Sequence, residues 1–215
     1  MRQGCYTNHM KSTPTKGTKN ILAVHALATR SELIEGNTWY SRANTVACSI
    51  ATEYAIPLEI AAGVIAALSP SNRWSRNMVD AENLVRAYRS GGVGDAMQMK
   101  VCTYGKMKEK AIQILENGIE DVETILNGRK ITAFYRCIMG EDDTVCVDGH
   151  AYSIWFGDRL TLKDVPSIGK RLYAEITADY VEAARILTED GYPTTCYEVQ
   201  AITWVTWRRL HGVTK

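Results

Sequence analysis

Apolar side chains recur every three or four residues along most of this chain, and that spacing constrains the fold more than any other feature. Each such stretch places its apolar side chains on one face of a helix, which must then be buried against a neighbour. On this basis helices are expected over residues 39–54, 58–68, 77–88, 106–115, 121–126, 129–139, 149–156, 168–187 and 196–209. Thr195 and Glu198 form a capping-box pair that marks the start of the last helix.

Strand signals are scarce by comparison. Residues 144–147 are the best candidate, because they include the β-branched residues that favour strands. The chain has 215 residues, of which 46% are hydrophobic, and this suits one domain or two small lobes that share a core. We therefore predict an all-α fold of about eight to ten helices. A polar, flexible arm is expected over residues 1–20 and a single helical domain over residues 21–215.

The formal net charge is +1, so the chain as a whole lacks the positive field that draws many proteins to nucleic acid. A local group of Lys and Arg side chains can still supply contacts to phosphates. The charge alone therefore does not exclude DNA as a partner.

Six cysteines are scattered along the chain, without a Cys-x-x-Cys pair and without His residues at zinc-site spacing. They are typical of small core residues in a reducing compartment, and we expect no metal and no cofactor. The polar N-terminus does not have the pattern of a secretory signal, and the longest mostly apolar stretch, residues 60–68, is too short to span a bilayer. The sequence predicts a soluble cytoplasmic protein without membrane contact.

Two neighbouring segments carry the strongest functional signal. Residues 126–130 read Leu-Asn-Gly-Arg-Lys and open a short apolar helix, and residues 145–150 read Val-Cys-Val-Asp-Gly-His. Lys130 and Asp148 are 18 positions apart. This pairing and spacing resemble the helix-hairpin-helix DNA glycosylase superfamily, and within it the endonuclease III class.

Two further segments follow the order of motifs in that superfamily. Residues 67–74, Ala-Leu-Ser-Pro-Ser-Asn-Arg-Trp, are similar to its Leu-Leu-Ser-x-Gln helix–loop–helix. Residues 104–111, Tyr-Gly-Lys-Met-Lys-Glu-Lys-Ala, resemble its Gly-Tyr-x-x-Lys-Ala helix. The resemblance covers residues 60–156, and its short length and degenerate hairpin also resemble phage-encoded relatives of the superfamily. In that case the protein would work in the cytoplasm of the host cell.

The resemblance implies two helical lobes around a cleft, with DNA as the partner and one nucleotide flipped out of the duplex. Asp148 would stabilise the positive charge that develops on the sugar as the N-glycosidic bond breaks. Lys130 would attack the sugar as the nucleophile of the bifunctional members, through a Schiff base. Gly128 and Arg129 would bind a backbone phosphate.

The loop before the second motif has an implied role as well. In the superfamily this loop pushes side chains into the duplex beside the flipped base. The residues that the resemblance assigns to this DNA contact are Ser71, Asn72, Arg73 and Trp74. Trp74 has a second interpretation as a core residue, because it directly follows a helix break.

The chain departs from the pattern at the hairpin, which carries one glycine, Gly128, where the family has two. An alignment on the lysine makes Lys130 the nucleophile, whereas an alignment on Leu-x-Gly makes it a phosphate contact. A plain surface charge is the third interpretation of Lys130. Asp148 also has a plain interpretation as the N-cap of the following helix. Only Cys196 lies beyond Asp148, so the four-cysteine loop of endonuclease III is missing and no iron–sulfur cluster is expected.

Three functions remain open. The first is a DNA glycosylase that flips a base and cleaves the N-glycosidic bond, with AP-lyase activity if Lys130 is the nucleophile. The second is a phage-type transferase that hypermodifies DNA bases on the same fold. The third is a DNA-binding relative without catalysis. The sequence leaves the target base, the strand preference and the oligomeric state undetermined.

Overall fold

The computed structural model describes residues 13–161 and 163–213. This part of the chain contains eleven α-helices, one 3-10 helix and no β-strand, and the all-α prediction is confirmed. The helices are α1 (Lys16–Ala26), α2 (Arg30–Asn37), α3 (Trp39–Glu53), α4 (Leu58–Leu68), α5 (Trp74–Gln98), α6 (Gly105–Asn117), η1 (Ile119–Asp121), α7 (Val122–Leu126), α8 (Arg129–Met139), α9 (Gly149–Phe156), α10 (Lys170–Glu189) and α11 (Cys196–Leu210). None of them is long and apolar enough to cross a membrane within the described residues.

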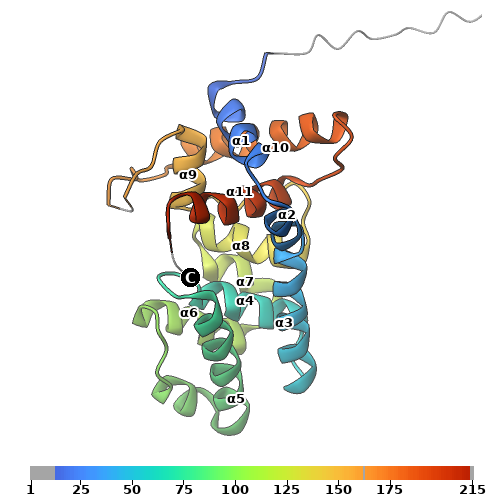
Figure 1. The fold of residues 1–215 in the computed structure, drawn as a ribbon. Helices are drawn as coiled ribbons and strands as arrows, with labels where there is room; N and C mark the ends of the chain where they lie inside the picture. Colours follow the sequence, from blue (N-terminus) through green and yellow to red (C-terminus); the bar gives the residue numbers. More distant parts are fainter. Residues whose placement is uncertain (1–12, 162, 214–215) are drawn as a thin grey trace, which may run out of the picture.

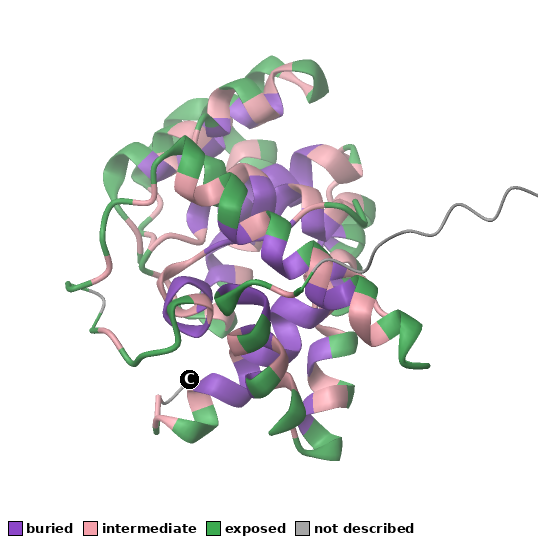
Figure 2. Ribbon diagram, turned by 90° about the horizontal axis from the view of Figure 1, so that it is seen from above, coloured by how far each residue is buried: buried purple, intermediate pink, exposed green. Residues whose placement is uncertain are grey.

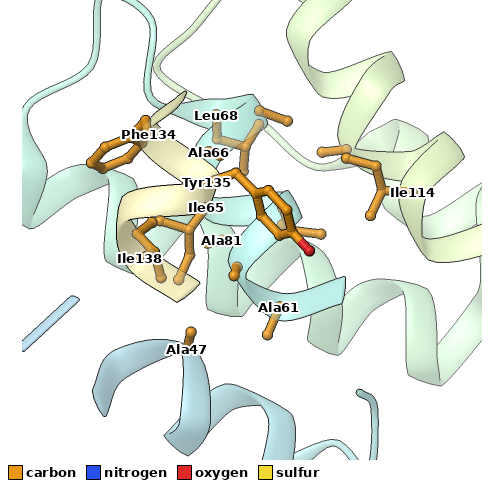
Figure 3. Packing of buried hydrophobic residues seen from close by; sticks show 14 of the residues in the cluster. Ala47, Ala61, Ile65, Ala66, Leu68, Ala81, Ile114, Phe134, Tyr135 and Ile138 are labelled. Atoms are coloured by element: carbon orange, nitrogen blue, oxygen red, sulfur yellow. The ribbon is translucent and has the colours of Figure 1, made fainter. Parts of the chain in front are cut away.

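Two hydrophobic cores divide the helices. The larger core surrounds α4, whose residues 60–68 are all buried, and it is completed by side chains from α3, α5, α6, α7 and α8. Figure 3 shows Ile65 and Leu68 of α4 among side chains of α8 such as Phe134 and Ile138. The smaller core is formed mainly by α1, α9, α10 and α11.

The helix α11 lies between these two groups. In Figure 1, α1, α9 and α10 gather at one end of the molecule and α5 lies at the other, with α11 between them. Its Ala201 belongs to the larger core, whereas its Val199 and Trp207 belong to the smaller one. Figure 2 shows that the helices are buried on their inner faces and exposed on their outer faces. The last helix of the chain therefore links both cores.

The first helix corrects the prediction of an arm over residues 1–20. Thr15 caps α1, which begins at Lys16, and residues 1–12 lie outside the described part of the chain. The hydroxyls of Thr15 and Thr18 donate to the buried Asp179 carboxylate of α10 at 2.7 and 2.9 Å. These contacts hold α1 against the C-terminal half, and they join residues more than 160 positions apart.

The predicted strand over residues 144–147 is not a strand. The Tyr173 hydroxyl of α10 donates to the Val145 carbonyl at 2.8 Å and accepts from the Val147 N–H at 3.1 Å. These backbone groups bond to a side chain, because the described part of the chain offers no neighbouring strand. The segment is instead a connection between α8 and α9 without regular secondary structure, and its residues 145–147 are buried.

Two other differences concern helix number and length. Helices α1 and α2 are additional to the expected set, so the count exceeds the prediction. Helix α5 runs from Trp74 to Gln98, beyond residue 88 where the sequence predicted its end, but Gly91 and Gly92 have non-helical backbone angles inside it. The regular helix therefore breaks at these two glycines, and α5 consists of two helical segments.

Candidate functional site

Asp148 lies at the N-terminus of α9, directly after the buried residues 145–147. Its Oδ1 atom accepts the Ala151 backbone N–H at 2.8 Å, so Asp148 is the N-cap of α9. Its Oδ2 atom accepts the indole N–H of Trp204, on α11, at 3.1 Å. The carboxylate is half-buried, and each oxygen receives one N–H. The capping interpretation is therefore correct, but it accounts for only one of the two oxygens.

The indole of Trp204 has further neighbours around the carboxylate. The Arg208 guanidinium lies over its ring, 4.4 Å from the centroid, and the ring centroids of His150 and Trp204 are 6.3 Å apart. Burial lowers the pKa of Arg208, while the Glu35 and Asp148 carboxylates raise it. Arg208 therefore places a positive charge near Asp148.

An aromatic cluster adjoins this carboxylate. We define it as Trp39 at the start of α3, Trp74 at the start of α5, Phe134 of α8 and Trp204 of α11. Ring centroids lie 5.0 Å apart for Trp39 and Trp74, 5.9 Å for Trp39 and Phe134, and 6.3 Å for Trp39 and Trp204. The three tryptophans are half-buried and Phe134 is buried. Segments far apart in the sequence thus meet beside Asp148.

Lys130 is exposed and lies four residues before Phe134 on α8, so the two share one face of that helix. The charges of Lys130 and Asp148 both affect the pKa of the buried Cys146 thiol. Burial raises the pKa of Cys146 to about 12, the Lys130 ammonium opposes this rise, and the Asp148 carboxylate adds to it. The thiol also donates to the Lys130 carbonyl at 3.6 Å, and Cys146 is two residues before Asp148 in the chain, so Lys130 and Asp148 lie in the same part of the molecule.

The turn between α7 and α8 consists of Asn127 and Gly128. Asn127 adopts left-handed backbone angles, with φ 41° and ψ 37°, and Gly128 is extended. No side chain caps the N-terminus of α8, so its first N–H groups point out of the helix with exposed Arg129 and Lys130 beside them. An uncapped N-terminus flanked by cations is suited to binding an anion.

The side chain of Lys110, on α6, binds the residues just before this turn. Its ammonium donates to the carbonyls of Ile125 and Leu126 at 2.6 and 2.5 Å, at the C-terminal end of α7. Burial and the neighbouring Lys106 charge lower the pKa of Lys110. Lys110 belongs to the segment that resembles the Gly-Tyr-x-x-Lys-Ala helix, and its role here is to hold the turn.

Arg129 and Lys130 point to different places. Arg129, Thr132 and Arg136 lie along one side of α8 and line a groove of about 790 Å³, whose opposite wall includes Tyr173 and Thr177 of α10. Gly128 also lines this groove, whereas Lys130 and Asp148 do not. The groove is therefore distinct from the aromatic cluster, and α8 separates the two.

The loop over residues 69–73 is attached to the segment before α6. The Ser71 hydroxyl is hydrogen-bonded to the Tyr104 hydroxyl at 2.9 Å, and the Thr103 hydroxyl donates to the Pro70 carbonyl at 2.7 Å. Ser71 has a φ of 56°, a left-handed conformation that is uncommon for serine. These contacts give the loop a defined shape.

Asp80, which is completely buried, holds the same loop from within. It accepts the Asn72 amide at 3.1 Å, the Cys102 backbone N–H at 2.8 Å and the Arg76 guanidinium at 2.8 Å. Asn72 is accordingly turned inward and half-buried, while Ser71 and Arg73 are exposed. Of the four residues assigned to the loop that contacts DNA, residues 71–74, Ser71 and Arg73 are the most accessible.

Sequence reasoning missed several residues of this region. Trp204 and Arg208 lie on α11 and reach Asp148 only through tertiary packing, so no local pattern indicates them. Trp39 and Trp74 are each the first residue of a helix, but the sequence predicted the start of the second helix at residue 77, so it did not show this shared position. No group of three or more His, Cys, Asp or Glu side chains suited to a metal ion occurs among the residues that the structure describes.

Comparisons with known proteins give one match. The model of the family DUF7178, described as a family of unknown function, matches residues 5–211. No curated protein and no solved structure matches the chain.

Proposed function

The chain belongs to the DUF7178 family, and because the function of that family is unknown, we propose from the site itself that the protein is a DNA-acting enzyme of the glycosylase type. It flips one nucleotide out of the duplex and cleaves its N-glycosidic bond beside Asp148. One observation carries this proposal. The segments whose motifs resemble the glycosylases supply Trp74 and Phe134, which belong to the aromatic cluster that reaches the half-buried Asp148 carboxylate through Trp204. They also supply Lys130, whose carbonyl accepts from the thiol of Cys146, two residues before Asp148.

The two hydrophobic cores support a glycosylase-like arrangement of two helical lobes. Trp39, Trp74 and Phe134 belong to the larger core or pack against it, while residues 145, 147 and 151 around Asp148 belong to the smaller one. In this proposal the aromatic cluster lies at the junction of the lobes, where a flipped nucleotide enters.

The chemistry suits the surroundings of Asp148. Water adds to C1′ of the sugar as the bond from C1′ to the base nitrogen breaks, and the water proton ends on the base. The sugar carries positive charge during this step, and a fixed carboxylate in partly dry surroundings stabilises that charge more than water does. Planar indole rings nearby provide surfaces on which a base stacks.

The proposal assigns the other contacts by accessibility. The uncapped N-terminus of α8, with Gly128 and Arg129, binds a backbone phosphate. Ser71 and Arg73, exposed on the fixed loop, probe the gap left by the flipped base. Lys130 has two candidate roles, as the nucleophile that forms a Schiff base with the sugar or as a further phosphate contact.

Base release from end-labelled DNA tests the role of Asp148. The substrates carry uracil, hydroxymethyluracil, oxidised guanine or an abasic site, and the variant is Asp148→Asn. Asparagine remains a good N-cap, so we expect the variant to fold and bind DNA but to lose base release. Asp179→Asn is the matched control, because Asp179 also accepts an indole N–H, from Trp155, outside the site.

The outcomes separate the three functions. Base release by Asp148→Asn at the wild-type rate would contradict the catalytic role of Asp148. DNA binding without base release from any substrate would favour the base-modifying transferase or the non-catalytic relative. Activity confined to DNA with a modified pyrimidine would identify the transferase.

Borohydride trapping distinguishes the roles of Lys130. A nucleophilic Lys130 gives a covalent DNA adduct that Lys130→Ala abolishes. A phosphate contact gives no adduct. In that case Lys130→Ala weakens DNA binding and lowers the slope of log affinity against log salt by about one.

A further inference from the structure

The bond between Trp204 and Asp148 joins a side chain of the last helix to the candidate catalytic carboxylate. Asp148 Oδ1 is held by the Ala151 N–H of its own helix, and Oδ2 is held by the Trp204 indole at 3.1 Å. A single hydrogen bond to one oxygen tolerates a range of angles, so it leaves the carboxylate some freedom to rotate about the Cβ–Cγ bond. A second donor on the other oxygen removes this rotation, so the plane of the carboxylate is defined.

Trp204 is itself restrained on several sides. Arg208, one helical turn later on α11, places its guanidinium 4.4 Å from the ring centroid. The rings of Trp39 and His150 each lie 6.3 Å away, in edge-on orientation. The indole is therefore unable to turn away from Asp148 without breaking these contacts.

We propose that Trp204 is the positioning residue for Asp148, and that Arg208 keeps the indole in place. This inference rests on the proposed function. It adds a requirement for α11, which lies outside residues 60–156 that resemble the glycosylases. The role follows from geometry: a charge that is aimed before the reaction stabilises the developing cation without the cost of reorientation.

A purely structural role for the bond is the competing explanation, because the bond also ties α11 to the connection before α9. The chain contains a control for this explanation. The Trp155 indole donates to Asp179 Oδ2 at 2.6 Å, which is the same type of bond in the smaller core, at a carboxylate that the proposal does not use. Removal of either N–H costs one indole–carboxylate bond.

The experiment compares Trp204→Phe, Arg208→Gln and Trp155→Phe with the wild-type chain on the DNA substrate that gives base release. Three quantities are measured for each protein: the single-turnover rate, the dissociation constant for DNA, and the melting temperature. We expect Trp204→Phe to lower the rate about ten- to a hundredfold, the range for loss of a hydrogen bond to a charged group, with the dissociation constant changed less than about twofold. Arg208→Gln should lower the rate by a smaller factor.

Trp155→Phe should lower the melting temperature and leave the rate unchanged. A separate readout is the indole N–H resonance of Trp204, which should move in Asp148→Asn while that of Trp155 stays in place. A wild-type rate for Trp204→Phe, or an equal loss of rate in Trp155→Phe, would overturn the positioning role alone. Absence of base release by the wild-type chain would instead overturn the proposed function, and the positioning role with it.

Discussion

The ring of Trp74 lies 5.0 Å from the ring of Trp39, with an angle of 45° between their planes. Trp74 also meets Phe134 edge-on at 6.3 Å. A residue that the sequence assigned to DNA contact is therefore packed among aromatic side chains, whereas its neighbour Arg73 is exposed. Adjacent residues of this loop thus have different surroundings.

This difference predicts separate effects of two substitutions. Trp74→Ala should lower the free energy of unfolding by about 2 kcal/mol, because a half-buried aromatic side chain loses its contacts. Arg73→Ala should change it by less than about 0.5 kcal/mol and weaken DNA binding instead. Urea denaturation and DNA titration check both variants. An unchanged stability for Trp74→Ala would mean that the indole does not contribute to packing and is free to enter a duplex.

A second prediction concerns pH and the ion pair between Glu32 of α2 and Arg209 of α11, whose atoms approach to 2.6 Å. The hydrogen bond from Arg209 lowers the pKa of the Glu32 carboxyl below its usual value of 4.5, against the opposing effect of burial. The folded state therefore gains stability from this group above pH 4.5. That gain is lost as the pH falls through the lowered pKa.

Glu32→Gln should accordingly lower the free energy of unfolding by about 1 kcal/mol at pH 7. The effect is modest because Arg209 is 45% exposed. The cost should shrink as the pH falls below 4.5. Glutamine retains the capping box with Thr29, so the substitution removes mainly the charge. Urea midpoints from pH 3 to pH 7 provide the measurement, with the exposed pair of Glu182 and Arg185 as a control. A cost that grows on acidification would contradict the assigned sign.

A third prediction concerns the close packing of α2 against α11. A Cβ atom added to Gly36 would lie 2.5 Å from the Cα atom of Ile202, which is backbone and does not move aside. Gly36→Ala should therefore destabilise the fold by about 2–3 kcal/mol. Gly94→Ala is the matched control, because nothing lies within 4 Å of the added atom and alanine favours a helix by up to about 1 kcal/mol. Equal stability of the two variants in thermal unfolding would show that α2 shifts without cost.

Local patterns predicted most of the helices but not the first two. Residues 58–68 were expected to form a buried helix, and the structure has α4 over this range. The capping box of Thr195 and Glu198 was also expected and is present. By contrast, α1 and α2 were not predicted, although Thr29 and Glu32 form a capping box that marks the start of α2. The Thr18–Asp179 bond and the Gly36–Ile202 contact that hold these two helices involve distant partners.

The residues of the candidate site likewise fall into those that the sequence indicates and those that depend on tertiary packing. The motif spacing indicates Lys130 and Asp148, and in the structure the Lys130 carbonyl accepts from the thiol of Cys146, two residues before Asp148. Their roles in DNA chemistry remain proposals. Trp39, Trp204 and Arg208 were not named, because their relation to Asp148 depends on how α3 and α11 pack.

By itself the sequence determined the helical class, most helix ends and the position of Asp148 as an N-cap, because these depend on contacts between residues three or four apart. Only the tertiary structure decided that the Trp204 indole meets Asp148, that Arg129 lines the groove against α10 while Lys130 does not, and that Trp74 is packed while Arg73 is exposed. The physical reason is that these relationships arise when two hydrophobic cores are buried together. Such burial brings side chains into contact from helices that share no local pattern.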